Sequence, residues 1–233
     1  MIVVGADDLP QRAVLEFNLH LALPFSLYSI VAVAAFTGAR RNEILALQWS
    51  DLDPVAKTLR IERALEETKG PVPGQGPSRR LKEPKRASHK RTIQIDDALI
   101  AVLLSERDKH LRLVAGVPDS VAVNLTLIKL PDGALMFPSL ASDIDFTRLR
   151  DAHAVTRTFE RQARKHFPKL RFHDLRGSHE TALLDAGVPV HVVAARCGHD
   201  PAVLLRSYAK RTKRADTSAA DVIGAMSKAL LAD

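Results

Sequence analysis

The sequence predicts a mostly α-helical protein with a small antiparallel β-sheet, an α+β fold. Two observations lead to this prediction. Apolar residues recur every three or four positions along much of the chain, and only the segments 58–62 and 91–95 alternate between apolar and polar side chains. The chain has 233 residues, of which 46% are hydrophobic and 26% are charged. This composition is typical of a globular protein with one sizeable core, so residues 1–233 are taken as a single domain.

The first part of the chain is predicted to hold helices. Residues 10–36 carry leucine and valine at mixed three- and four-residue spacing, and Pro24 divides them because proline removes a helix hydrogen bond. Gly38 marks the next break, and a short helix is predicted over 41–47.

A hairpin region is predicted over about 58–95. Its two alternating segments pair as an antiparallel sheet, and the long insertion between them contains a proline- and glycine-rich tip at 70–77. Asp96 or Asp97 is placed to cap the helix that follows, over roughly 97–112.

Irregular structure is predicted for residues 113–145 and helices for most of the remainder. These helices are expected near residues 152–167, 174–186, 189–197, 201–210 and 216–231. No stretch approaches 18 uninterrupted apolar residues, which argues against a membrane span and a signal peptide. We therefore expect a soluble, cytoplasmic protein with no membrane partner.

The charge distribution points to an acidic polymer as the partner. The formal charge is +7, the isoelectric point is near 9.7, and residues 69–91, 148–176 and 206–214 are all strongly basic. One such run is usually a solvated surface, but three together favour a phosphate backbone. Aromatic residues make up only 5%, which argues against a single-strand binder that stacks bases on exposed rings. The candidate DNA contacts are Arg79, Arg80, Lys82, Arg86, Lys90, Arg91, Arg206 and Lys210.

Six further polar residues are not explained by helix packing: Arg40, Lys85, His173, Arg176, His199 and Tyr208. Taken singly, each has an ordinary structural explanation, such as a capping histidine, a paired arginine or a half-buried tyrosine. Taken in order, they resemble the catalytic domain of the tyrosine recombinase (phage integrase) family. The resemblance covers roughly residues 10–215. It rests on Thr37-Gly38-Ala39-Arg40 with Glu43, Pro84-Lys85 with Arg91-Thr92-Ile93, His173-Asp174-Leu175-Arg176, Gly198-His199 and Tyr208.

The resemblance implies the tyrosine recombinase catalytic-domain fold and the activity of a site-specific recombinase or integrase. In that family a tyrosine hydroxyl, here that of Tyr208, attacks a DNA phosphodiester. The attack gives a 3′-phosphotyrosyl intermediate and a free 5′-hydroxyl. The covalent link keeps the bond energy, so no metal, ATP or other cofactor is implied. Tyr28 is the only other tyrosine, and it precedes an apolar run that favours core packing.

The resemblance also implies roles for the other five residues. Arg40 and Arg176 carry planar, permanently charged guanidiniums, and with His199 they are expected to stabilise the negative charge of the transition state. His173 is the candidate acceptor for the proton of a phenol whose ordinary pKa is about 10. Lys85 is the candidate general acid for the leaving 5′-oxygen, provided that neighbouring cations lower its pKa.

The resemblance also implies an oligomeric state and a cellular location. It implies double-stranded DNA as the partner and a homotetramer on that DNA, formed from a chain that is monomeric when free. It also implies a bacterial or phage-encoded, nucleoid-associated protein of a mobile element. Family members usually carry a DNA-clamping domain before the catalytic one. Only 39 residues precede Arg40, so we expect this N-terminal core-binding domain to be absent. The tail helix at about 216–231 packs either on a neighbouring subunit or on its own domain.

Two other functions fit part of the pattern. A type IB topoisomerase-like enzyme uses similar chemistry, but Lys85 in a hairpin well before His173 favours an integrase. A DNA-binding module with a decayed catalytic domain is the non-enzymatic alternative, and the presence of all six positions argues against decay. Packing or surface roles are predicted for Trp49, Cys197, His89, His153, His179 and His191.

Overall fold

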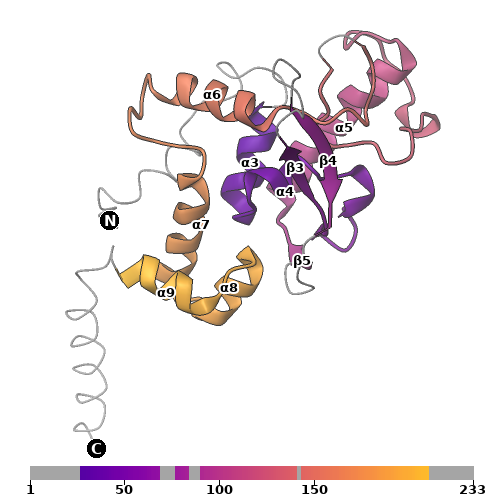
Figure 1. The fold of residues 1–233 in the computed structure, drawn as a ribbon. Coiled ribbons are helices and arrows are strands. Elements are labelled where there is room, and N and C mark those ends of the chain that lie inside the picture. Colours follow the sequence, from indigo (N-terminus) through magenta and orange to yellow (C-terminus); the bar gives the residue numbers. More distant parts are fainter. Residues whose placement is uncertain (1–26, 69–76, 84–89, 141–142, 210–233) are drawn as a thin grey trace, which may run out of the picture.

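The computed structural model describes residues 27–68, 77–83, 90–140 and 143–209. Their helices surround one central helix, and two small antiparallel sheets lie to one side (Figure 1). The helices are α3 (Leu27–Thr37), α4 (Arg41–Ile44), α5 (Asp97–Ala115), α6 (Ala152–Ala163), α7 (Asp174–Asp185), α8 (Val190–Cys197) and α9 (Pro201–Ala209), with 3-10 turns at Trp49–Asp51 and Leu125–Leu127. Within these ranges, no helix is both long and apolar enough to cross a membrane.

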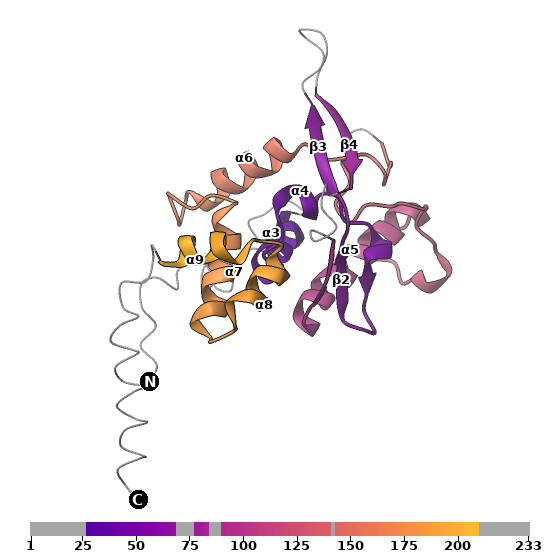
Figure 2. The ribbon, with the colours of Figure 1, turned by 60° about the horizontal axis from the view of Figure 1, so that its bottom comes forward.

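Helix α3 forms the centre of the core. Ile30 and Val33 have no exposed surface, and even Ser29 and Thr37 are buried. A helix that is apolar on all sides packs on all sides, and α3 contacts α4, α5 and α7. It lies between the α7–α9 group and the group formed by β2 and α5 (Figure 2). The end of α3 therefore delivers the chain at Gly38 to the middle of the molecule.

The sheet predicted from residues 58–62 and 91–95 is confirmed. Strands β2 (Thr58–Ile61) and β5 (Arg91–Gln94) pair antiparallel with Leu59 opposite Ile93, and β1 (Leu52–Asp53) joins the outer edge of β2. Both Leu59 and Ile93 are buried, as strand alternation predicts.

The insertion between these strands holds a second, two-stranded sheet that the pattern did not predict. Strands β3 (Ala64–Thr68) and β4 (Ser78–Lys82) pair antiparallel, with Glu66 opposite Arg80 and Glu67 opposite Arg79. Opposite charges facing each other across a strand pair stabilise it. This hairpin projects from the body of the molecule (Figure 2).

Most predicted helices are confirmed with shifted ends. The Asp96 carboxylate accepts a hydrogen bond from the Leu99 amide and so begins α5, and Gly116 ends it with a φ of 65°. The helix predicted over 41–47 is shorter, because Ala46 and Leu47 make i to i+3 bonds to the carbonyls of Glu43 and Ile44. The predicted segments 10–26 and 216–231 lie outside the described residues.

Candidate active site

Three helix ends meet at the residues that the sequence predicts to be catalytic. Arg40 caps α4 just after the end of α3, His173 and Arg176 begin α7, and His199 follows α8. Gly38 makes the meeting possible: its φ is 65°, and a Cβ there would lie 2.8 Å from the Cys197 sulfur. Only glycine adopts this conformation at low cost and lets the elements approach so closely.

Glu43 holds both the backbone and the guanidinium of Arg40, whose side chain stays partly exposed to solvent. Its backbone N–H donates to Glu43 Oε2 at 2.8 Å, and its Nη1 donates to Glu43 Oε1 at 2.9 Å. Its Nη2 donates to the Gly198 carbonyl at 2.7 Å, which ties it to the residue before His199. The side chain is still 39% exposed, so Arg40 is oriented and accessible at once.

Arg176 is buried, with only 3% of the residue exposed. Its Nη1 donates to the Gly38 carbonyl at 2.6 Å, and its Nε lies 3.1 Å from Glu180 Oε1. Its Nη2 is buried with no hydrogen-bond partner among the described residues. A buried charged donor without an acceptor is costly. An anion that reaches this nitrogen would therefore gain a strong, charge-assisted hydrogen bond.

His199 is held next to the same carboxylate. Its Nδ1 lies 3.3 Å from Glu180 Oε1, and its side chain is 20% exposed. Burial, followed by the charges of Arg176 and Arg40, lowers the pKa of His199 to about 4. The imidazole is therefore neutral near pH 7 and offers one N–H as a hydrogen-bond donor.

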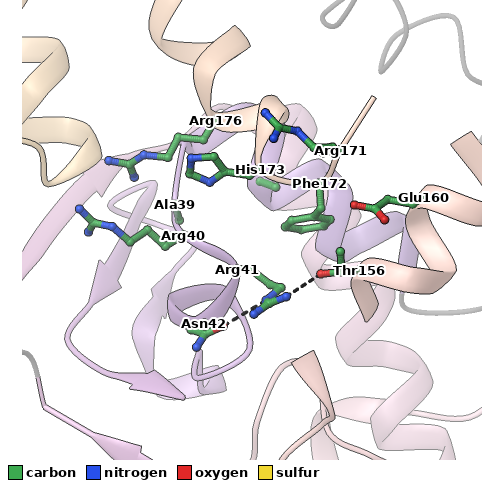
Figure 3. Close-up of a pocket in the computed structure, with 11 residues that line it drawn as sticks. Ala39, Arg40, Arg41, Asn42, Thr156, Glu160, Arg171, Phe172, His173 and Arg176 are labelled. Atoms are coloured by element: carbon green, nitrogen blue, oxygen red, sulfur yellow. Dashed lines mark hydrogen bonds between the residues drawn. The ribbon is translucent and has the colours of Figure 1, made fainter. Parts of the chain in front are cut away.

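A pocket of about 450 Å³ opens beside Arg40, His173 and Arg176. In Figure 3 the guanidiniums of Arg40 and Arg176 extend to the same side, and the exposed His173 ring lies beside the Arg176 side chain. The other residues that line the pocket are Ala34, Ala39, Arg41, Asn42, Thr156, Glu160, Arg171 and Phe172. Two guanidiniums and an imidazole at one opening suit a phosphate group.

Arg41 is a lining residue that the sequence analysis missed. Its Nη1 donates to Thr156 Oγ1 at 2.6 Å and its Nε to Asn42 Oδ1 at 3.1 Å (Figure 3). These bonds fix a third guanidinium at the far side of the pocket. The only signal in the sequence was its position next to Arg40.

The structure does not place Tyr208 in this pocket. The tyrosine lies on α9, and its hydroxyl donates a hydrogen bond of 2.8 Å to Oδ1 of Asp185, the last residue of α7. That hydrogen bond, with a smaller effect of burial, raises the pKa of Tyr208. The expectation that one phenol lies beside the two guanidiniums is therefore not met in this arrangement, because a nearby carboxylate holds the hydroxyl.

The candidate DNA contacts are largely occupied by carboxylates. Arg79 binds Glu67 and Asp151, Arg80 and Lys82 bind Glu66, and Lys90 binds Glu83. Arg91 differs from the rest, since its side chain is only 7% exposed and pairs with Glu43. The surface contact predicted for Arg91 is thus replaced by an internal ion pair.

The remaining predicted residues lie on α9, in the packing between helices, or outside the described residues. Arg206 is exposed on α9, and its Nε donates to the Ala202 carbonyl. Lys85, Arg86 and Lys210 lie outside the described residues. Cys197 and His179 are buried in the packing between helices, as expected. Among the described residues, no three His, Cys, Asp or Glu side chains form a group that could hold a metal ion.

Comparisons with known proteins show which family and fold this chain is similar to. Residues 12–214 match the model of the phage integrase family. A tyrosine recombinase XerC-like protein of Caldanaerobacter subterraneus is 28% identical over 179 residues, which are 74% of this chain and 42% of that protein. The integrase of Salmonella phage P22 is 25% identical over 183 residues, 78% of this chain and 38% of that protein. This chain thus spans less than half the length of these two relatives.

Solved structures share the fold. The Tn1549 transposon integrase, in complex with transposon right-end DNA, matches 94% of this chain and 64% of its own with a TM-score of 0.66 at 18% identity. XerA recombinase matches 89% of this chain and 58% of its own with a TM-score of 0.57 at 18% identity. The fold is therefore that of tyrosine recombinase catalytic domains, and the family match over most of its length makes this chain a member of the phage integrase family.

Proposed function

We propose that this chain is the catalytic part of a site-specific DNA recombinase. It cleaves and rejoins double-stranded DNA through a 3′-phosphotyrosyl intermediate on Tyr208, without metal or ATP. The observation that carries the proposal is the buried Arg176, whose Nη2 has no partner among the described residues and which lies beside the accessible Arg40. A scissile phosphate supplies the anion that this arrangement suits.

The reaction needs no net change in the number of phosphodiester bonds. The Tyr208 hydroxyl oxygen attacks phosphorus, the bond from phosphorus to the 5′-oxygen breaks, and the phenolic proton passes to His173. The leaving 5′-oxygen takes its proton from Lys85. Arg40, Arg176 and the N–H of neutral His199 bind the non-bridging oxygens as their negative charge grows. A 5′-hydroxyl of another strand reverses these steps and joins the new strand.

The nucleophile must first exchange partners. In the hydrogen bond to Asp185 the pKa of Tyr208 is raised, which makes its deprotonation harder. Beside two guanidiniums the phenolate would be favoured instead. Cleavage therefore requires α9 to move Tyr208 from Asp185 to the phosphate.

The proposed function also includes a location and an assembly. The protein acts on the DNA of a bacterial mobile element, in the cytoplasm and nucleoid, and it is a homotetramer when bound to DNA.

A covalent-trapping experiment tests the proposal without a known target site. The protein is incubated with nicked duplexes of randomised sequence, in which a short 5′-hydroxyl fragment is lost after cleavage. Adducts that resist detergent are isolated and sequenced. We expect enrichment of one core sequence, attached to the protein through its 3′ end.

The matched control is Tyr208→Phe, with Tyr28→Phe as the comparison tyrosine. Loss of adduct in Tyr208→Phe and its retention in Tyr28→Phe support the proposal. An adduct that survives Tyr208→Phe contradicts the assigned nucleophile. Binding to DNA without any adduct would favour a non-catalytic DNA-binding module.

A further inference from the structure

Arg91, the first residue of β5, is a buried cation next to the pocket that the proposed chemistry does not use. Its Nη2 donates to Glu43 Oε2 at 2.8 Å, and its Nη1 lies 3.3 Å from Glu43 Oε1. Its Nε donates to the Arg196 carbonyl at 2.8 Å. The side chains of Arg91 and Glu43 are only 7% and 9% exposed, so solvent screens this pair weakly.

One carboxylate thus holds two guanidiniums. Glu43 binds Arg91 from β5 and Arg40 from the start of α4. Arg91 also bonds to the Arg196 carbonyl in the last turn of α8. Arg40 bonds to the carbonyl of Gly198, the residue that follows α8. These bonds join β5, the start of α4 and the end of α8 immediately before His199.

The balance of charge in this network explains why a second arginine is needed. Glu43 and Glu180 are two carboxylates, and Arg40, Arg91 and Arg176 are three guanidiniums. One formal positive charge is left for an incoming anion. Without Arg91, the buried Glu43 carboxylate would have Arg40 as its main counter-charge, and the cluster would be formally neutral. Two charges a few ångströms apart interact strongly where water is excluded.

We propose that Arg91 is a positioning residue that neutralises Glu43 and thereby keeps the charge of Arg40 available for a phosphate. The proposal rests on the proposed function, since it concerns the same phosphate site. It differs from the DNA contact expected from sequence, because Arg91 acts from inside the fold and does not touch the substrate.

Inorganic phosphate is the probe, because it requires neither a target sequence nor a reaction. Its affinity is measured by calorimetry at low salt for the wild-type chain, Arg91→Met and the double variant Arg91→Met/Glu43→Gln. We expect Arg91→Met to weaken phosphate binding about 10-fold. The double variant should recover to within about threefold of wild type, because it restores one net positive charge. A role that Arg91 plays only through its bond to the Arg196 carbonyl would not be rescued by neutralising Glu43.

Arg63→Met is the matched control. Arg63 pairs with the buried Asp51 at 2.5 Å, away from the pocket, so this variant also breaks an ion pair and should bind phosphate like wild type. Arg91→Lys keeps the charge and should stay within about threefold of wild type, which covers the case in which Arg91→Met fails to fold. Circular dichroism checks folding in every variant.

The outcomes separate this inference from the proposed function. Unchanged phosphate affinity in Arg91→Met, or a double variant as weak as the single one, overturns the role of Arg91. Failure of the wild-type chain to bind phosphate overturns it as well. Absence of a Tyr208 adduct, with the phosphate results as expected, would instead contradict the proposed reaction and leave the role of Arg91 standing.

Discussion

At the scale of single residues, Tyr208 and Asp185 form the contact with the clearest consequence for activity. The hydroxyl donates to the carboxylate at 2.8 Å, and this bond raises the pKa of the tyrosine. The free energy of the bond must be lost before the oxygen can reach a phosphate. The pair lies at the surface, where such a bond contributes about 0.5 to 1 kcal/mol, so it would slow cleavage a few-fold.

We therefore expect Asp185→Ala to lower the pKa of Tyr208 towards its ordinary value and to speed adduct formation about two- to fivefold. The chain has only two tyrosines, so absorbance titration on a Tyr28→Phe background reports Tyr208 alone. Asp185→Asn is the control: it removes the charge but keeps an acceptor, and its effect should be intermediate. A slower Asp185→Ala variant would show that the acid assists the reaction.

A second prediction concerns the shape of the cation at position 176. Arg176→Lys keeps the charge but cannot reach both the Gly38 carbonyl and a phosphate with a planar fork. We expect adduct formation to fall by about 10² to 10³, the loss that follows removal of one oxyanion donor. Arg63→Lys makes a comparable change at the Asp51 pair and should react at the wild-type rate. Equal rates for Arg176→Lys and wild type would exclude Arg176 from the site.

At the scale of elements, the end of α8 limits how the site is built. Gly198 ends this helix with a φ of 65°, and a Cβ there would lie 2.9 Å from Arg91 Nη1. Gly116 ends α5 with the same φ, but a Cβ at that position would have nothing within 4 Å. The two glycines therefore separate conformational strain from steric conflict with the site.

We expect Gly116→Ala to cost about 1 kcal/mol of stability and no activity, because only the left-handed backbone is penalised. Gly198→Ala should carry the same strain and also displace Arg91, so that adduct formation drops at least 10-fold. Urea denaturation measures the first effect and covalent trapping the second. Equal activity in the two variants would contradict the close approach at Gly198.

Some helices of this fold could be predicted from the sequence, whereas two strands and several contacts could not. Helices such as α5 were predictable because apolar spacing and a capping aspartate are local signals. Strands β3 and β4 were not, because their pairing depends on Glu66 and Arg80 facing each other across a gap in sequence. The same reason hid the Tyr208 contact, whose partners lie 23 residues apart, and the pair of Arg91 with Glu43, which are 48 apart. Motif order predicted the candidate site residues, and the fold shows which groups hold those that lie in the described part of the chain.

At the scale of the whole molecule, buried histidines connect the packing to pH. His110 Nδ1 accepts a hydrogen bond from the indole N–H of Trp49, and His179 Nε2 accepts one from Arg196 Nε. Protonation of either ring at that nitrogen would place a hydrogen against a donor. Burial is the main cause that lowers the pKa of each histidine to about 4, and neighbouring cations add to it.

These two shifts predict a loss of stability in mild acid. Above pH 6.5 both histidines are neutral in the folded and unfolded states and contribute nothing. Between pH 6.5 and 4 the unfolded chain takes up protons that the folded chain refuses, so the free energy of unfolding falls by at most about 3 kcal/mol for each histidine. Glu106 acts in the opposite direction, because burial raises its pKa and the folded state holds its proton more tightly.

Urea midpoints at pH 7 and pH 5 measure the balance between the histidines and Glu106. The wild-type midpoint should be clearly lower at pH 5, and His110→Asn/His179→Gln should be less stable at pH 7 but change less between the two values. An equal change in wild type and the double variant would mean that other groups control the acid response, because the two buried rings would then titrate alike in the folded and unfolded chain.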